Sequence, residues 1–430
     1  MNQRRFFISL LIPLLVWALS PARFTIQAEE DWSVWLFNRG DTPGASGQPT
    51  LARIYLDGAT EEYVFPVPEG ATLEGPPFAF SANGNWIAFC VTAGDRAELV
   101  VDNLYGEVDD TAQALGITAF PLHFPVATPE GCLISSAAFK VGDDSRLVFG
   151  ALNSFPGSGN VDPTLPQWEI RVVNLASGAI EAILTPDQLA AAGFAPSGES
   201  ATTPMTPLVR SFGETVIFNL LPYSSGGGIP EIVGYAWNPA TGVITPDARY
   251  DHSILALEQR TDAAGAIQGT ELVWATYDES VYTPPAAGST AATPRYNTVQ
   301  YTDVSGATYP IFVQPDGIGA LAFVNDGRLL VVRVLSFGMI AIDRSGARMG
   351  LPIDLQSGTP VGAPGGYVFV DEDIATLSAR LIYHQFAADG YTIQPTVLWQ
   401  ATPYRGWTIV WRAPMTIAVD LRPFPGIGQP

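Results

Sequence analysis

The sequence predicts an all-β fold in which one four-stranded unit is repeated seven times. The first observation is a polar turn followed by a short apolar strand, as in "FSANGNWIAFC" at Phe80–Cys90, which recurs along the chain. The second is a turn that pairs an aspartate or asparagine with a glycine downstream of each such strand. The third is the near absence of helical periodicity, with "PDQLAAAGF" at Pro186–Phe194 as the main exception. Alternating apolar positions between turn signals are typical of short strands.

The N-terminal segment, residues 1–28, has the pattern of a secretory signal peptide. Two arginines, Arg4 and Arg5, precede the uncharged apolar run Phe6–Ser20. As a helix this run would rise about 22 Å, less than the roughly 30 Å of a bilayer core, which favours a cleaved signal over an uncleaved anchor. The candidate cleavage sites follow small residues: Ala28, Ala18 and Ala22.

The chain is strongly acidic, with 42 Asp and Glu against 21 Lys and Arg and a net charge of −21. Such a surface repels phosphate backbones and anionic membranes, so we expect no nucleic acid partner but a protein or an extracellular ligand. With the signal sequence, this predicts an exported protein, periplasmic or extracellular, without a transmembrane segment in the mature chain. Lys140 is the only lysine, and the sequence gathers the arginines in no cluster.

The turn-and-strand unit begins with residues that close a hairpin. In "SANG", Asn83 and Gly84 tolerate positive φ, and the residues from Trp86 to Val91 then alternate as a strand does. The similar units are "VGDDSRLVFGAL" from Val141, "SFGETVIFNLL" from Ser211, "NDGRLLVVRV" from Asn325, and the looser "QGTELVWATY" from Gln268 and "LSARLIYHQF" from Leu377.

The second turn recurs in the same order along the chain. An Asx side chain that bonds to its own backbone and a glycine that completes the turn explain why the two residue types are paired. The pairs are Asp57–Gly58, Asp102–Gly106, Asn174–Gly178, Asn238–Gly242, Asp303–Gly306 and Asp343–Gly346. A seventh, degenerate hairpin is expected at "LWQATPYRGWTIVW", Leu398–Trp411.

These units resemble the TolB-type, WD-like propeller repeat, in which Ser-Pro-Asp-Gly precedes an apolar strand and a glycine-containing hairpin. "SANGNW" lacks the proline and the aspartate, so the resemblance rests on repetition from Trp32 to the C-terminus. It implies a seven-bladed β-propeller of four-stranded blades over residues 29–430, because one blade cannot bury its face alone. An array of immunoglobulin-like sandwiches is the alternative, but it gives no reason for paired turns at this period.

The first blade is one strand short, with strands expected at Trp32–Asn38, Leu51–Leu56 and Glu62–Val67. The alternating tail "MTIAVDLRP", Met415–Pro423, supplies a strand that no other blade uses. We expect it to be the innermost strand of the first blade, so that a C-terminal strand closes the ring and leaves no open sheet edge.

Loop length separates the two faces of such a propeller. The tight turns lie on one face, and the other carries long connections rich in Pro, Gly, Ser and Thr, such as residues 153–167 and 278–297. Loops on a rigid scaffold commonly carry binding residues, and insertions without a role are the alternative. The candidate binding residues are aromatics near or within these loops: Phe155, Trp168, Tyr223, Tyr282 and Tyr391.

Cys90 and Cys132 are the only cysteines, and in an exported chain they predict a disulfide. In propeller order one blade-to-blade step separates them, so the bond would join neighbouring blades beneath the long loops. Two buried thiols are the alternative, since cysteine is often a small core residue.

The sequence holds no recognisable catalytic or metal-binding motif. It has no G-x-S-x-G elbow, and its histidines (His123, His252 and His384) lack the spacing of metal ligands. No catalytic residue, metal or cofactor is therefore predicted. The sequence favours a non-enzymatic module that binds a protein or ligand through the long-loop face. The alternative is an extracellular hydrolase or lyase that acts on glycans or peptides in the axial channel.

Overall fold

The computed structural model describes most of the chain after the N-terminal segment. The described residues are 32–40, 49–67, 69–73, 78–93, 96–126, 133–152, 166–194, 205–222, 233–247, 250, 255–261, 267–281, 296–335, 338–352, 358–373, 375–387, 392–402, 406–413 and 421–427. Within these ranges the protein is almost entirely β-structure, as the turn and strand pattern predicts.

The strands follow one another as antiparallel meanders. The first half of the chain contains β1 (Ser33–Asn38), β2 (Thr50–Tyr55), β3 (Thr60–Val64), β4 (Thr72–Leu73), β5 (Ala79–Phe80), β6 (Trp86–Ala93), β7 (Arg96–Asn103), β8 (Leu122–Val126), β9 (Leu133–Lys140), β10 (Asp143–Leu152), β11 (Trp168–Asn174), β12 (Ile180–Leu184), β13 (Met205–Phe212), β14 (Val216–Pro222), β15 (Val233–Trp237) and β16 (Ile244–Pro246). The second half contains β17 (Leu255–Thr261), β18 (Ile267–Thr276), β19 (Thr298–Thr302), β20 (Thr308–Val313), β21 (Ile318–Val324), β22 (Leu329–Val334), β23 (Gly338–Asp343), β24 (Arg348–Gly350), β25 (Val361–Ala363), β26 (Gly366–Asp373), β27 (Ser378–Phe386), β28 (Ile393–Ala401) and β29 (Trp407–Arg412).

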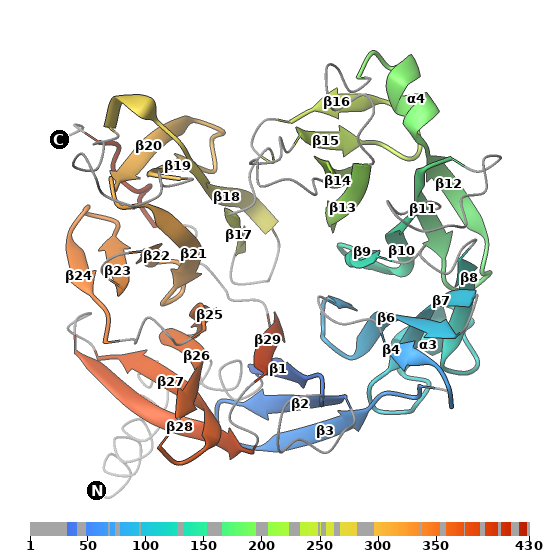
Figure 1. The fold of residues 1–430 in the computed structure, drawn as a ribbon, viewed down its shortest axis with the longest axis horizontal. Coiled ribbons are helices and arrows are strands. Elements are labelled where there is room, and N and C mark those ends of the chain that lie inside the picture. Colours follow the sequence, from blue (N-terminus) through green and yellow to red (C-terminus); the bar gives the residue numbers. More distant parts are fainter. Residues whose placement is uncertain are drawn as a thin grey trace, which may run out of the picture.

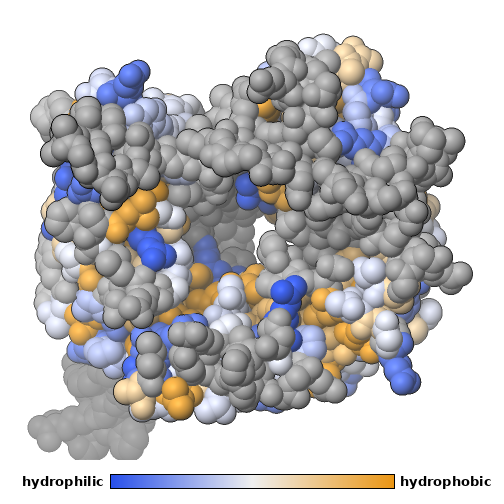
Figure 2. Space-filling model, in the orientation of Figure 1, coloured by the Kyte–Doolittle hydropathy of each residue, from blue (hydrophilic) through white to orange (hydrophobic). Residues whose placement is uncertain are grey.

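The sheets are arranged around a common centre, with the first strand of each set near the centre and the last at the rim (Figure 1). Four sheets have four strands, and β4 to β8 form a sheet of five. The eight-stranded sheet consists of two antiparallel sets, β9–β12 and β13–β16, joined by one parallel bridge pair, Phe212 and Lys140. Figure 2 is the space-filling view in the same orientation, and it shows a hollow near the centre. Hydrophobic residues are exposed on part of the described surface around this hollow.

The recurring turns form through the Asx chemistry that the sequence predicts. The Oδ1 atom of Asp343 accepts hydrogen bonds from the backbone N–H groups of Ser345 and Ala347, at 2.8 and 2.9 Å. The side chains of Asp57, Asn174, Asn238 and Asp303 accept bonds from the backbone of their turns in the same way. The β7–β8 connection differs from the prediction, because Asn103 and not Asp102 caps its turn. Asp102 instead accepts a bond from the hydroxyl of Tyr63 at 2.5 Å.

The strand that lies beside β1 is not the predicted one. β1 pairs with β2 on one edge and with β29 on the other, so the fourth strand of the first sheet is Trp407–Arg412. The assignment of Met415–Pro423 to this position is therefore wrong, and residues 414–420 lie outside the described part. The predicted hairpin at Leu398–Trp411 is also wrong, because β28 and β29 belong to different sheets.

Buried clusters link neighbouring sheets. Val34 and Ile54 of the first sheet pack with Val368 and Leu381 of the β25–β28 sheet in one cluster. This cluster joins the first sheet in the sequence to the last complete one. Other clusters join β1–β3 to the next two sets, β9–β12 to β13–β16, β17–β20 to β21–β24, and β21–β24 to β25–β28. In the described residues no such cluster joins β13–β16 to β17–β20.

Two short α-helices interrupt the strands in the described residues. The predicted helix near Pro186–Phe194 is present as α4 (Pro186–Ala191), with a capping box between Thr185 and Gln188. The sequence did not predict α3 (Asp110–Ala114), whose N-cap Asp109 accepts a bond from the backbone of Ala112 at 2.8 Å.

Replacing Gly84 with alanine is expected to lower the free energy of unfolding by about 2–3 kcal/mol. Gly84 ends the "SANG" turn at φ +71°, and an added Cβ would overlap the ring of Trp411 in β29. Gly178 has a similar φ of +68° with open space around it, so Gly178→Ala is the matched control at about 1 kcal/mol. Urea denaturation measures both values. Equal losses would show that Trp411 does not hold this turn.

Candidate functional site

Two cavities open among the tight turns, at the end of the sheets that we call the turn face. It carries the turns between the first and second and between the third and fourth strands of each set. One cavity, of about 330 Å³, lies at the turns of the β21–β24 sheet. The other, of about 310 Å³, lies between the β9–β12 and β13–β16 sets. The opposite end, the loop face, carries the remaining connections.

Three arginines line the first cavity, which we call the arginine pocket: Arg328, Arg344 and Arg348. Arg328 follows the turn between β21 and β22, Arg344 lies in the β23–β24 turn, and Arg348 begins β24. Met349 of β24 and Leu421 of the C-terminal segment also line the pocket with apolar side chains. The pocket therefore combines guanidinium groups with apolar walls, and it draws on two turns of one sheet and on the end of the chain.

Arg344 forms a buried ion pair that joins two sheets. Its Nη2 and Nη1 atoms donate to the two carboxylate oxygens of Glu271 on β18, at 2.7 and 2.9 Å. The side chains of Glu271 and Arg344 are 0% and 8% exposed. The hydroxyl of Tyr301 also donates to Glu271, and burial together with that carboxylate raises the pKa of Tyr301. This bidentate pairing is the geometry in which a guanidinium binds a carboxylate most strongly.

The turn that precedes Arg328 is held in a fixed conformation. Asn325, Asp326 and Gly327 all have positive φ, which is uncommon for the first two residue types. Arg344 donates to the carbonyl oxygen of Gly327 from Nε at 2.8 Å and from Nη2 at 2.6 Å. The carboxylate of Asp326 accepts a bond from the backbone of Gly365 in the next sheet, at 3.1 Å. The backbone next to Arg328 is therefore held in one conformation.

Arg328 and Arg348 form no ion pair with a described residue, and both are exposed at the pocket. The guanidinium of Arg348 lies over the ring of Phe312, 4.8 Å from its centroid, a cation–π contact. Among the described lining residues Asp343 is the one carboxylate, and its Oδ1 already accepts the turn's hydrogen bonds. Because Arg344 is neutralised by Glu271, the described part of the lining keeps two guanidinium charges against one carboxylate.

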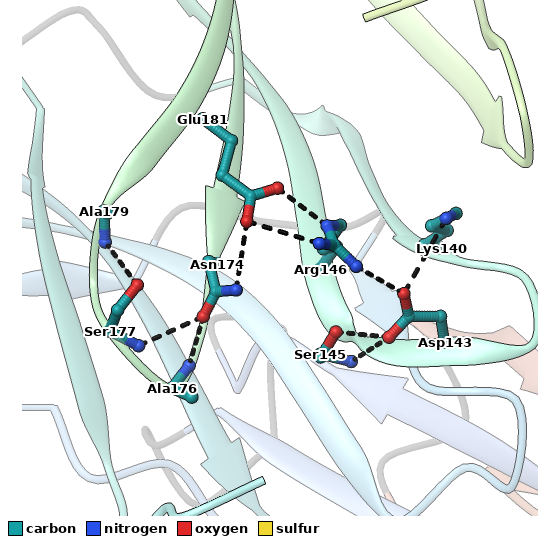
Figure 3. A network of polar contacts seen from close by, with 9 residues as sticks. All are labelled: Lys140, Asp143, Ser145, Arg146, Asn174, Ala176, Ser177, Ala179 and Glu181. Carbon is teal, nitrogen blue, oxygen red and sulfur yellow. Dashed lines mark hydrogen bonds and ion pairs between the residues drawn. The ribbon is translucent and has the colours of Figure 1, made fainter. Parts of the chain in front are cut away.

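The second cavity has a different electrostatic character (Figure 3). Arg146 donates to Glu181 at 2.7 Å and to Asp143 at 2.6 Å, and the Nζ of Lys140 lies 3.7 Å from Asp143. Hydrogen bonds from Arg146 and Asn174 hold the pKa of Glu181 below its ordinary value. Each cation here has a carboxylate partner, so the network neutralises itself and stabilises the neighbouring turns.

The structure describes few of the predicted binding residues. Trp168 begins β11 and is 2% exposed, so its ring belongs to the core between two sheets and not to a contact surface. Cys90 is buried on β6, whereas Cys132 lies outside the described residues, so the disulfide stays a prediction. The remaining candidates, Phe155, Tyr223, Tyr282 and Tyr391, also lie outside the described residues.

The two histidines in the described residues, His123 and His384, have structural partners. His384 is buried and hydrogen-bonds to the hydroxyl of Tyr367 at 2.7 Å, and burial lowers its pKa. His123 pairs with Glu98 at 3.0 Å near the rim. Across the described ranges, no group of three or more His, Cys, Asp or Glu side chains is arranged to hold a metal ion. None of the helices described there is long and apolar enough to cross a membrane.

Sequence reasoning missed the arginine pocket. The sequence shows no arginine cluster, yet the fold brings together Arg328, Arg344 and Arg348. One local signal was available: "NDGR" and "DRSGAR" place arginines at both tight turns of a single repeat unit. Since those turns lie at the same end of one sheet, their side chains are neighbours.

No protein-family model matches the sequence, and no curated protein matches it. Among solved structures, prolyl oligopeptidase B from Galerina marginata, bound to a 35-residue hydrolysis and macrocyclization substrate, is similar over 89% of this chain and 51% of its own, with 10% identity and a TM-score of 0.47. TolB from Acinetobacter baumannii is similar over 76% of this chain and 65% of its own (16% identity, TM-score 0.36). BamB from Moraxella catarrhalis is similar over 86% and 88% (12% identity, TM-score 0.39). The chain thus spans about half the length of the prolyl oligopeptidase structure, and these similarities assign it no function.

Proposed function

We propose that this protein is an exported, seven-bladed β-propeller that acts as a non-enzymatic binding module, and that its partner binds on the loop face. Seven successive sets of strands support the blade count, if the two halves of the eight-stranded sheet are taken as separate blades. The pairing of β29 with β1, and the cluster shared by β1, β2, β26 and β27, support closure of the ring through a C-terminal strand.

The unequal length of the connections is the observation that carries this function. On the turn face, most consecutive strands are joined by short segments, such as residues 141–142, 213–215, 325–328 and 344–347, and the β7–β8 connection, residues 104–121 with α3, is the long exception. On the loop face, the joining residues include 153–167, 223–232 and 277–297. Long connections in a compact domain are commonly functional, and a rigid scaffold positions them for binding. The aromatics Phe155, Tyr223 and Tyr282 belong to these connections.

The base of the longest of these connections is held by a buried asparagine. Asn297, which is 0% exposed, accepts a bond from the backbone N–H of Asp278 at 2.7 Å and donates to its carbonyl oxygen at 2.8 Å. The residues between can therefore be changed while the ends of β18 and β19 keep their clamp. This loop is the best place to separate binding from folding.

Deleting Tyr282–Pro294, with a short Gly-Ser linker in their place, is expected to weaken partner binding at least tenfold and to leave the melting temperature nearly unchanged. Shortening a surface loop changes its closure entropy by only about 0.6 kcal/mol per halving of length. The partner is isolated by affinity capture from the envelope fraction of the producing cells, and its dissociation constant is then measured for both forms. Differential scanning calorimetry checks the fold.

The matched control is Val243→Ser, which changes a side chain on the turn face that is 58% exposed. It should leave the dissociation constant within about twofold. An equal loss in this variant would place the binding surface on the other face. Turnover of peptide or glycan substrates by the purified protein, retained in the loop variant, would favour the hydrolase alternative and contradict a purely binding role.

A further inference from the structure

We propose that the arginine pocket is a second binding site, separate from the loop face, and that it takes a single carboxylate attached to a small apolar group. The shared chemistry is that of a short carboxylic acid or of a peptide C-terminus with an apolar last residue. The proposal does not depend on which partner the loop face binds, because the pocket lies at the opposite end of the sheets.

The charge of the pocket is the first argument. Arg328 and Arg348 have no ion-pair partner among the described residues, in a chain whose net charge is −21. Arg328 and Arg348 both line one cavity, and the third arginine there already has Glu271 as its partner. Guanidinium groups match carboxylate geometry and form charge-assisted hydrogen bonds that are stronger than neutral ones.

Preorganisation is the second argument. The guanidinium of Arg348 lies 4.8 Å from the centroid of the Phe312 ring, and this cation–π contact restrains the side chain. Arg328 follows a turn with three consecutive positive-φ residues, and Arg344 fixes that turn through two bonds to the carbonyl of Gly327. A site whose backbone and one of whose two arginines are already restrained loses less conformational entropy when the ligand binds.

The size and walls of the pocket select the ligand. A volume of about 330 Å³ is at the lower end of the range for small-molecule sites. Met349 and Leu421 provide apolar surface beside Arg328 and Arg348. An inorganic anion would make no use of this apolar surface. Long-range repulsion from the acidic chain also disfavours polyanions, whereas a single carboxylate is repelled far less.

The direct test is isothermal titration calorimetry with N-acetyl-leucine and with its uncharged amide. The acid should bind in the millimolar to sub-millimolar range and the amide at least tenfold more weakly. Arg328→Gln and Arg348→Gln should each weaken binding of the acid by about tenfold. Arg39→Gln is the matched control, since it removes one charge from an exposed arginine at the end of β1 and should change the affinity less than about twofold.

Further probes distinguish the two sources of the carboxylate. The peptide Ala-Ala-Leu with a free C-terminus binds tighter than N-acetyl-leucine if the natural ligand is a peptide end, and no tighter if it is a small acid; both results support the site. Equal binding by acetate or inorganic phosphate would overturn the role of the apolar walls. The proposal is also overturned if the acid does not bind at about 10 mM, or if Arg39→Gln loses as much affinity as the pocket variants. Thermal melts verify that all variants are folded.

Discussion

Replacing Glu271 with alanine is expected to lower the free energy of unfolding by about 3–5 kcal/mol. The change leaves the guanidinium of Arg344 in a site where its side chain is 8% exposed, without the carboxylate that receives two of its hydrogen bonds. It also removes the acceptor of the Tyr301 hydroxyl. A buried charge that loses its partner bears the desolvation cost alone. Urea denaturation followed by tryptophan fluorescence measures the loss.

The double variant Glu271→Met, Arg344→Met is the informative control. Replacing both charges with apolar side chains of similar length removes the unpaired ion, so much of the lost stability should return. Since Arg344 also donates to the carbonyl of Gly327, recovery is expected to be incomplete. A double variant no more stable than Glu271→Ala would mean that the bonds to Gly327 matter more than the ion pair.

The local part of the fold was predictable because its chemistry is local. An Asx side chain closes on backbone groups two to four residues ahead, as Asn174 and Asp303 do, and the glycine follows at a fixed offset. The Thr185 capping box likewise needs only four residues. Each of these turns and caps is formed by residues that are close together in the sequence. The repeated unit and the all-β class could therefore be predicted from the sequence.

The strand that pairs with β1 was not predictable in the same way. Both Trp407–Arg412 and Met415–Pro423 alternate, and both lie after the last complete unit. What selects the first is non-local: Trp411 packs against Phe80 and against the glycine of the "SANG" turn, which only a pairing with β1 brings near. Period-two alternation fixes which residues share a face of a strand but not which strand lies beside it.

The candidate sites also depend on contacts between residues that are far apart in the sequence. The arginine pocket depends on two turns, a neighbouring sheet that supplies Glu271, and the segment that contains Leu421, so no short window of sequence reveals it. The aromatics were chosen by their place near loops, and Trp168 shows the limit of that criterion. It is the first residue of a strand, and its side chain faces the core.

Residues 421–427, near the C-terminus, lie at the junction between the β17–β20 and β21–β24 sheets, beside β20 and β21 (Figure 1). Phe424 is 1% exposed and packs against Tyr301 and Phe323. Its carbonyl oxygen accepts a bond from the hydroxyl of Tyr309 at 3.0 Å, and the guanidinium of Arg344 lies 4.5 Å from the centre of its ring. Phe424 therefore fills the space between the two sheets and packs against both.

Truncation after Pro414 is accordingly expected to lower stability sharply even though β29 remains, and Phe424→Ala in the full chain should reproduce about 3–5 kcal/mol of that loss. The reason is the cavity left between the sheets and the exposure of the Glu271–Arg344 pair to water. Ile427→Ala is the control, because this side chain is 51% exposed and its backbone bond to Pro310 survives, so its cost should stay within about 0.5 kcal/mol. If truncation is costly but Phe424→Ala is not, the stability that truncation removes does not come from the packing of Phe424.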